Sequence, residues 1–367
     1  MSVCLNMIVK DEAHVIRRCL ASVRPLIDSW VIVDTGSSDG TQEVIRDCLA
    51  DIPGTLHERH WKDFGHNRSE ALALARDAAS YSFVIDADDL LIVPPGFKKP
   101  NLSADAYSVL IRDSGTQYRR TCLFANRLAW RYVGVLHEYP EADAGYSLDI
   151  LDDFQIERRI EGGRSKIGLI EKYLNDAALL EQALQDEPTN ARYVFYLAQS
   201  YRDAGRLEKS LANYQRRTTM GGWEEEVWYA HYEIAMLSER LGLADEIITQ
   251  RYLEAYQARP KRIEPLVKLA RRFREKNQYE LAHLFAEKAL STPTTKDFLF
   301  VDMAAYEWCA LDEYAIASYW IGNYEACRDA CEKLLAGKAL PQQHRARVAE
   351  NLRFARAGMV TSRSIGK

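Results

Sequence analysis

The chain has 367 residues, 47% of them hydrophobic and 28% charged, and this ordinary globular composition excludes a fibrous or wholly disordered protein. A net charge of −5 and an isoelectric point near 6.0 exclude a chain-wide basic surface for nucleic acid, although a local basic patch remains open. The length predicts two or three domains.

Several features favour a cytoplasmic protein. No apolar run reaches the roughly 18 residues of a transmembrane helix, so no membrane span is expected. Residues 3–9 are apolar but lack the basic flank and the cleavage site of a signal peptide. The seven cysteines are odd in number, and none of them forms a C-x-x-C motif.

The first part of the chain alternates between predicted strands and helices. Apolar runs predict strands at residues 3–9, 30–33, 55–58 and 83–85. Helical periodicity predicts helices at residues 11–23, 41–50 and 65–79. Because short links join these elements, we expect an α/β fold, a mostly parallel sheet flanked by helices. Further strands are expected at residues 106–111 and 122–135, the second long enough for a hairpin.

The second part is helical and weakly repetitive. Tyrosines and small residues between positions 193 and 214 have the spacing of a tetratricopeptide helix pair. Turn-forming residues recur at intervals close to the length of one such repeat, at Gly205, Gly242, Asn277 and Gly322. We therefore expect an α/β domain over residues 1–165, a joint at 161–165, and an all-α domain of tetratricopeptide-like repeats over 166–367.

The predicted strand at residues 83–85 stops at three carboxylates, Asp86, Asp88 and Asp89. Ligands bind at the carboxyl ends of strands in open α/β sheets. Clustered carboxylates repel one another unless they are compensated, and their oxygens suit Mg²⁺ or Mn²⁺, which take further ligands from a substrate phosphate. A metal–diphosphate site is one interpretation. An acidic turn that caps the next element is the other, and it is the commoner one for an isolated D-x-D triplet.

A loop rich in glycine and hydroxyl residues follows the strand at residues 30–33. Its small residues let the backbone approach a ligand and leave N–H groups free. Asp34, at the end of the strand, can accept a hydrogen bond from a nucleobase. Asp39, with Gln42 three residues later, fits a helix capping box as well as it fits a ligand contact.

Three motifs, in this order, resemble those of family-2 glycosyltransferases: MIVKDE at residues 7–12, VDTGSSDGT at 33–41 and DADD at 86–89. Three weak motifs in order are more specific than any one of them. The resemblance is strongest over residues 3–90 and closest to the subgroup with a C-terminal tetratricopeptide domain. It implies the GT-A fold, a nucleotide-sugar donor, expected to be a UDP-sugar, and hexosyl transfer with inversion at the sugar carbon.

The resemblance also implies roles for individual residues. Asp88 would hold Mn²⁺ or Mg²⁺ on the diphosphate, and Asp86 would face the ribose or a metal-bound water. Many relatives carry a second aspartate at position 35, where this chain has threonine, and this weakens the case for base recognition. The residues expected to contact the donor are Ile8, Lys10, Asp34, Thr35, Asp39, Arg68 and Asp86.

Residues 130–138 resemble the segment of the same subgroup that runs from a tryptophan to a His-Glu pair. His137 would complete the metal shell with Asp86 and Asp88 or bond to the diphosphate. Glu138 would be the general base, with Asp113 as the runner-up. A His–Glu pair that only holds a loop is the alternative interpretation.

Two other functions are weighed against transfer. A sugar-nucleotide pyrophosphorylase needs a glycine-rich, basic loop directly after the first strand, where this chain has residues KDE at 10–12. A tetratricopeptide interaction scaffold with an inactive GT-A-like domain is the alternative, and the intact acidic cluster argues against it. The helical half is expected to present an unidentified acceptor (a protein, a glycan or another macromolecule) or a second copy of the chain, and to hold no catalytic group.

Overall fold

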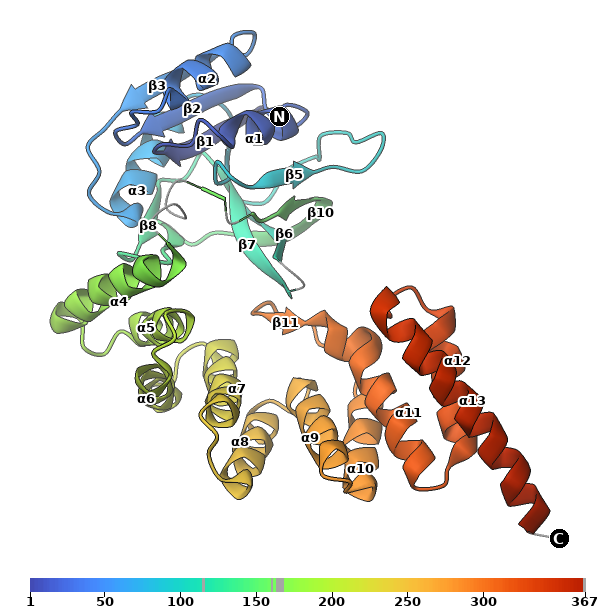
Figure 1. Ribbon diagram of the computed structural model, residues 1–367. Coiled ribbons are helices and arrows are strands. Elements are labelled where there is room, and N and C mark those ends of the chain that lie inside the picture. The colour runs from blue at the N-terminus through green and yellow to red at the C-terminus, as the bar shows by residue number, and fades with distance from the viewer. Residues whose placement is uncertain (114–115, 160, 163–167, 366–367) are drawn as a thin grey trace. The chain divides into compact units, whose positions relative to one another are not determined.

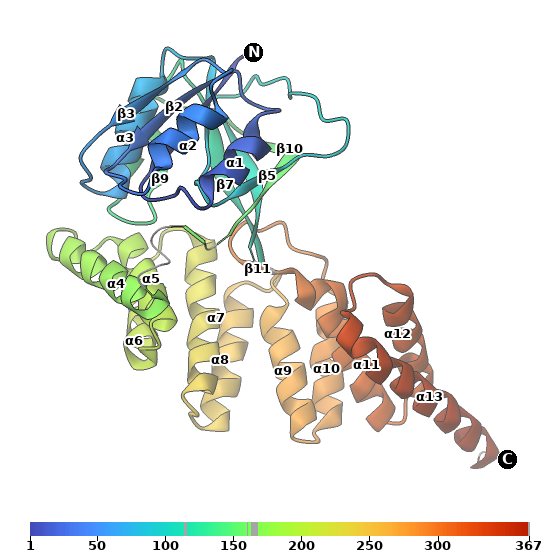
Figure 2. The same ribbon diagram turned by 45° about the horizontal axis from the view of Figure 1, so that its top comes forward.

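The computed structural model describes residues 1–113, 116–159, 161–162 and 168–365. The chain forms two compact units, Met1–Asn213 and Tyr214–Lys367 (Figures 1 and 2). Most of the expected joint, and the expected domain boundary after residue 165, lie outside the described residues, so this boundary stays a prediction.

The first unit is built on a mixed sheet with strand order β3-β2-β1-β4-β7-β6-β10-β5 (Figure 1). Strands β3, β2, β1 and β4 are parallel to one another. Their carboxyl ends therefore share one edge, where the loops after β1, β2 and β4 meet. The strands are β1 (Val3–Val9), β2 (Ser29–Asp34), β3 (Gly54–Glu58), β4 (Tyr81–Val84), β5 (Leu90–Ile92), β6 (Ala106–Asp113), β7 (Thr116–Ala125) and β10 (Leu148–Glu157). A separate antiparallel pair is formed by β8 (Trp130–Val133) and β9 (Tyr139–Ala142).

Helices cover both faces of the parallel strands. The buried side chains of α1 (Ile16–Val23) and α2 (Thr41–Cys48) share one hydrophobic core with Leu5 and Met7 of β1. Cys4 packs on the other face with Ala75 of α3 (Phe64–Ala75), because successive side chains of a strand point to opposite faces.

The predicted α/β class is confirmed, with several corrections. The helix expected at residues 11–23 begins only at Ile16, since residues 11–15 form a loop that is described below. Residues 122–135 do not form a hairpin: β7 pairs with β6 and β4, and β8 pairs with β9. Strands β5, β9 and β10 were not predicted.

The first unit also includes helices α4 (Leu169–Asp186) and α5 (Ala191–Asp203), and α6 (Leu207–Thr218) crosses into the second unit. Helix α5 contacts the loop after β8. The guanidinium group of Arg192 donates to the carbonyl oxygen of His137 at 3.0 and 3.1 Å, and Val135 N donates to the Tyr193 hydroxyl at 3.4 Å. The start of the helical region therefore supports the loop that carries the His-Glu pair.

The second unit is a helical array in which each helix packs against the next one along the chain. Its elements are α7 (Glu224–Arg240), α8 (Asp245–Ala258), α9 (Glu264–Glu275), α10 (Tyr279–Leu290), β11 (Val301–Asp302), the π-helical segment η2 (Ala305–Cys309), α11 (Ala310–Trp320), α12 (Tyr324–Ala336) and α13 (Gln342–Ile365). None of the helices described in either unit is both long and apolar enough to span a membrane.

The four predicted turn residues of the helical part are confirmed. Each follows a helix and has a positive φ, between 59° and 82°. Glycine and asparagine tolerate this left-handed conformation, which ends a helix and lets the chain reverse. The four are Gly205, Gly242, Asn277 and Gly322.

Candidate functional site

Two loops at the carboxyl edge of the parallel strands are tied together by hydrogen bonds. Asp11 N donates to Ser37 Oγ at 2.9 Å, and Asp11 Oδ1 accepts from Ser38 N at 2.8 Å. Ala13 N donates to Asp39 Oδ2 at 3.0 Å. These bonds hold Asp11 at a φ of 55°, an uncommon conformation for a residue other than glycine. They also explain why α1 begins late, since they use backbone groups that a helix would need.

Asp34 is completely buried at the end of β2. Its Oδ1 accepts from Gly36 N and Ser37 N, both at 2.7 Å, so this carboxylate shapes the following loop. Its Oδ2 is buried too, and it has no hydrogen-bond partner among the residues that the structure describes. An unsatisfied buried acceptor costs about 1–3 kcal/mol, which a ligand N–H could recover.

Asp39 caps α2 in a different way from the one expected. Its Oδ1 accepts from Thr41 N at 3.1 Å and from Thr41 Oγ1 at 2.5 Å. The predicted capping box with Gln42 is wrong, because the residue at the N-cap is Gly40 and the Gln42 side chain accepts from Arg46.

Three other predicted donor contacts lie near this edge. Thr35 is buried, and its hydroxyl donates to the carbonyl oxygen of Val9 at 3.1 Å, which is a structural role. Ile8 is half-buried in β1, and Lys10 is exposed at its end.

Two arginines connect the carboxylates of the acidic cluster. Arg68 Nη2 donates to Asp86 Oδ1 at 2.5 Å, and its Nε lies 2.6 Å from Glu138 Oε1. Arg120 Nη1 donates to Asp86 Oδ2 at 3.1 Å, and its Nη2 donates to Asp89 Oδ2 at 3.4 Å. The structure therefore joins the predicted residues Arg68, Asp86 and Glu138 in one network.

The three aspartates after β4 differ in their protonation chemistry. Burial would raise the pKa of Asp86, but the guanidinium groups of Arg68 and Arg120 hold it well below its usual range. Burial and the charge of Asp86 raise the pKa of Asp88. The same two causes raise the pKa of Asp89 to about 7. The charged forms of Asp88 and Asp89 are therefore disfavoured in the absence of a further cation.

Asp88 is held by the chain that follows β10. Its Oδ2 accepts from Gly162 N at 2.9 Å and from Glu161 N at 3.3 Å. A Cβ on Gly162 would lie 3.1 Å from both Asp88 Oδ2 and Glu12 Oε1. A larger side chain at this position would therefore crowd both carboxylates. Asp88 and Glu12 therefore lie close together at this edge.

These residues fit one kind of metal site. Among the described residues no three His, Cys, Asp or Glu side chains are arranged to hold a metal ion. The charge on Asp88 nevertheless suits Mg²⁺ or Mn²⁺ bound by one or two carboxylates together with substrate phosphates. Asp88 is the ligand that fits best, since both oxygens of Asp86 are bound by arginine.

His137 lies apart from such a ligand group. Its ring stacks on Tyr196 of α5 with 3.8 Å between the ring centroids, and Arg192 binds its carbonyl oxygen. This arrangement matches the alternative interpretation, in which the residue anchors a loop.

Asp113, the runner-up for the base, ends β6 and pairs with Arg158 at 2.9 Å. Arg120 was not predicted. Its only signal in the sequence is a basic pair, 119–120, next to the apolar residues of a strand.

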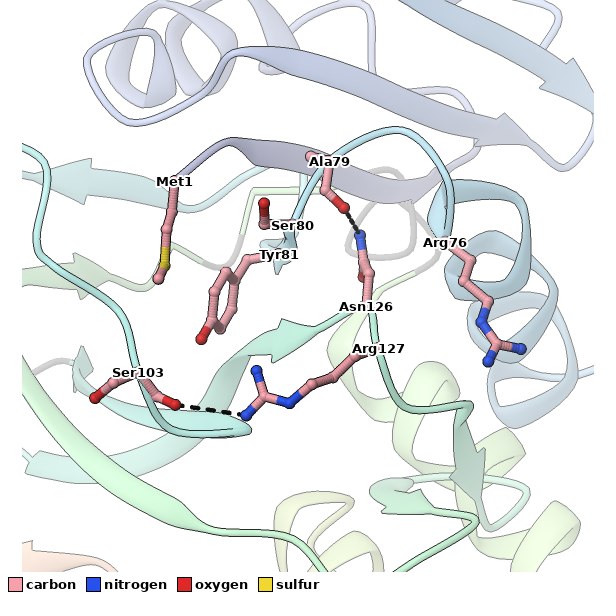
Figure 3. Close-up of a pocket in the computed structure, with 8 residues that line it drawn as sticks. All are labelled: Met1, Arg76, Ala79, Ser80, Tyr81, Ser103, Asn126 and Arg127. Atoms are coloured by element: carbon pink, nitrogen blue, oxygen red, sulfur yellow. Dashed lines mark hydrogen bonds between the residues drawn. The ribbon is translucent and has the colours of Figure 1, made fainter.

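A cavity of about 410 Å³ lies at the opposite edge of the sheet, beside the start of β4 at Tyr81 (Figure 3). Asn126 in its wall donates to the carbonyl oxygens of Ala75 and Ala79 and accepts from Ser82. This asparagine is therefore a structural anchor, and the cavity is separate from the acidic cluster.

Asp89→Asn is expected to flatten the pH dependence of stability. With its pKa raised from 3.8 to about 7, Asp89 binds a proton in the folded protein that it releases on unfolding. The resulting stabilisation is complete below about pH 4 and is lost as the pH rises through about 7. Urea unfolding at several pH values should show a smaller decrease in this interval for the variant. An equal decrease in both proteins would contradict the raised pKa.

Comparison with known proteins adds independent information. Residues 4–94 match the model of glycosyl transferase family 2. A TPR repeat-containing protein of Synechococcus elongatus is 29% identical over 315 residues, which cover 79% of this chain and 75% of that protein.

Two solved structures are similar at low identity. The C-terminal part of a TPR repeat-containing protein from Cytophaga hutchinsonii is 17% identical, with 53% of this chain and 75% of that chain covered and a TM-score of 0.37. S. aureus TarS 1–349 in complex with UDP-GlcNAc is 12% identical, with 67% and 93% covered and a TM-score of 0.35.

The matched segment, residues 4–94, contains β1, β2 and β4 and the acidic cluster that follows them. The region beyond β10 is an array of packed helices with the turn pattern of tetratricopeptide repeats. Residues 4–94 of the chain are therefore similar to glycosyl transferase family 2, and a tetratricopeptide-like helical array follows them.

Proposed function

We propose that the chain transfers a sugar from a nucleotide-sugar donor, expected to be a UDP-sugar, to an acceptor hydroxyl, with inversion and with the help of Mn²⁺ or Mg²⁺. The observation that carries this proposal is the buried Asp34 Oδ2, which lacks a hydrogen-bond partner among the described residues and lies at the same sheet edge as Asp88. Strands β2 and β4 flank β1, so these positions are two strand spacings apart, roughly 10 Å. A nucleoside diphosphate is long enough to join them.

In this proposal the base donates an N–H to Asp34 Oδ2, and the ribose passes over β1 near Ile8 and Lys10. The hydrogen-bonded loops after β1 and β2 hold the backbone in place around the nucleoside. The diphosphate lies at Asp88, which would hold the divalent cation. When bound, the cation supplies Lewis-acid neutralisation of the charge that develops on the departing diphosphate.

Glu138 takes the proton of the acceptor hydroxyl as the acceptor oxygen attacks the sugar carbon and the bond to the diphosphate breaks. Arg68 positions this carboxylate, since its guanidinium group bridges Glu138 and Asp86. Arg120 keeps Asp86 ionised from the other side. Burial of these charges strengthens their mutual interactions relative to bulk water.

A second candidate function is a tetratricopeptide scaffold with an inactive donor domain. It is favoured by the name of the Synechococcus relative and by the engagement of both Asp86 oxygens with arginine. Slow hydrolysis of a nucleotide sugar by the purified chain would separate the two candidates, because a scaffold has no such activity.

Asp34→Asn is expected to weaken binding of uridine nucleotide sugars by about 10- to 100-fold. The asparagine NH₂ group can face the N–H of the base, so that two donors meet where the wild type has a donor and an acceptor. A thermal-shift panel of nucleotide sugars with Mn²⁺ measures this, since a ligand at 100 times its Kd stabilises by about 2.7 kcal/mol. The matched control is Asp77→Asn, an exposed residue after α3 that should leave every shift unchanged. Equal shifts for the Asp34 variant and the wild type would exclude Asp34 from base recognition.

A further inference from the structure

The second unit contains a cavity of about 360 Å³ that is lined by many charged side chains. Helices α9, α11 and α13 and the π-helical segment η2 contribute most of its wall. The lining residues are Tyr232, Glu264, Val267, Lys268, Arg271, Arg274, Asp302, Ala305, Trp308, Cys309, Asp312, Glu313, Ile316, His344 and Arg347. Four of these side chains are acidic and four are basic. Most small-molecule pockets are lined mainly by hydrophobic side chains, so the high share of charged residues sets this cavity apart.

Helical periodicity brings these side chains together. On α9 the lining residues recur every three or four positions from Glu264 to Arg274, so they share one face. The same spacing runs from Ala305 to Ile316 across η2 and α11. Trp308 and Cys309 lie in the π-helical segment, and such segments often occur at functional sites.

Two ion pairs hold the walls in place. Arg274 of α9 donates two hydrogen bonds to the carboxylate of Glu313 of α11, from Nε at 2.5 Å and from Nη2 at 3.1 Å. Arg347 of α13 binds Asp312 of α11 in the same way, at 2.8 and 3.1 Å. Bidentate pairs fix geometry as well as charge. The cavity is therefore bounded by three helices that are cross-linked at its rim.

Most of the charged side chains that line the cavity are paired with a side chain of opposite charge. Glu264 is compensated by Arg262, which is completely buried and does not line the cavity. With Arg274 and Arg347 bound to their carboxylates, Lys268 and Arg271 are the remaining cations of the lining, and Asp302, whose Oδ1 accepts from Ala304 N at 3.1 Å, is the remaining carboxylate. Arg271 pairs with the exposed Glu275, and water screens such a pair.

Lys268 is the most informative residue of the cavity. It is half-buried in the wall, and it makes no hydrogen bond or ion pair with any residue that the structure describes. Its amine can donate three hydrogen bonds. Two of the lining carboxylates, Asp312 and Glu313, are already engaged by arginine. A cation held in this way is a ready partner for an anion.

We propose that this cavity binds an acidic glycan, in which Lys268 and Arg271 pair with the carboxylate or phosphate of one sugar residue. Sugar hydroxyls both donate and accept hydrogen bonds, so they can bond to both members of the Arg274–Glu313 and Arg347–Asp312 pairs. The indole of Trp308, which stacks with His344 at 5.0 Å, offers an apolar surface for the C–H face of a sugar ring.

An acidic peptide fits the same cavity less well. Its side chains would need apolar subsites, but Val267, Ala305 and Ile316 are the only aliphatic residues in the lining. A glycan uses the many paired charges as hydrogen-bonding groups without breaking them. The claim that the cavity binds an acidic glycan is independent of the proposed function. The further claim that this glycan is the acceptor of sugar transfer rests on the proposed function.

The test is a ligand-observed NMR titration of the full chain without donor or metal, with glucuronate, glucose 1-phosphate, glucose and N-acetylaspartate as probes. Glucuronate or glucose 1-phosphate should bind more tightly than glucose and N-acetylaspartate. Lys268→Gln should weaken the anionic sugars by about 10- to 100-fold and leave glucose unchanged. The matched control is Lys288→Gln, an exposed residue of α10 that should change nothing.

Three results would overturn the inference: no binding of either anionic sugar, equal binding by the Lys268 variant, or N-acetylaspartate binding as tightly as glucuronate, which would indicate a peptide site. Arg271→Gln is a second variant, and it should also weaken the binding of the anionic sugars. Because the titration contains no nucleotide sugar, a failure of donor turnover leaves its result unaffected, and the two proposals fail independently.

Discussion

Asp88→Asn is expected to lower sugar transfer by at least about 100-fold and to abolish the requirement for Mn²⁺ or Mg²⁺ in donor binding, because it removes the ligand that would place the cation against the transferring group. The free energy of unfolding should not fall. Burial and the neighbouring Asp86 penalise the charged form of Asp88, as its raised pKa indicates, and asparagine relieves that penalty. Its amide oxygen can still accept from Gly162 N.

Asp86→Asn is the matched comparison for this variant. The carboxylate of Asp86 is bound by Arg68 and Arg120, and its pKa is held low, so its loss should destabilise the fold as well as lower activity. Turnover and urea unfolding measured together separate the two residues. Unchanged turnover in the Asp88 variant, or full wild-type activity in excess chelator, would exclude the proposed metal site.

Glu138→Gln is expected to lower transfer by about 10²- to 10⁴-fold, the usual contribution of a positioned general base, while the affinity for the donor stays nearly unchanged. Glutamine has nearly the same size and shape and keeps an oxygen near Arg68 Nε, so the loop should remain in place. Steady-state transfer rates and donor binding by thermal shift are the two measurements.

Asp113→Asn serves as the control, since its carboxylate pairs with Arg158. Its transfer rate should match that of the wild type. If the Glu138 variant kept its transfer rate but lost donor affinity, Glu138 would belong to the binding site and Asp113 would become the candidate base.

Parts of this site could be predicted because they depend on local sequence. The apolar runs of β1, β2 and β4 are buried on both faces, so the positions where they end, and with them Asp34 and Asp86, follow from the order of residues. The turns of the helical array were equally predictable, because glycine and asparagine tolerate a positive φ.

Other parts depend on contacts between distant residues. Arg120 reaches Asp86 only because β7 pairs antiparallel with β4, and no local pattern encodes that pairing. The late start of α1 follows from hydrogen bonds between loops 26 to 29 positions apart. His137 stacks on Tyr196, a residue of the helical region, which its His-Glu motif does not indicate.

The most direct test of this account is the release of nucleoside diphosphate from a UDP-sugar by the purified full chain, measured with Mn²⁺ and again with excess chelator. The account predicts release that requires the metal and that is lost in the Asp88→Asn variant while its fold is retained. Release that is equal with the metal, with chelator and in the variant would contradict it, as would a complete absence of release from every nucleotide sugar in the panel.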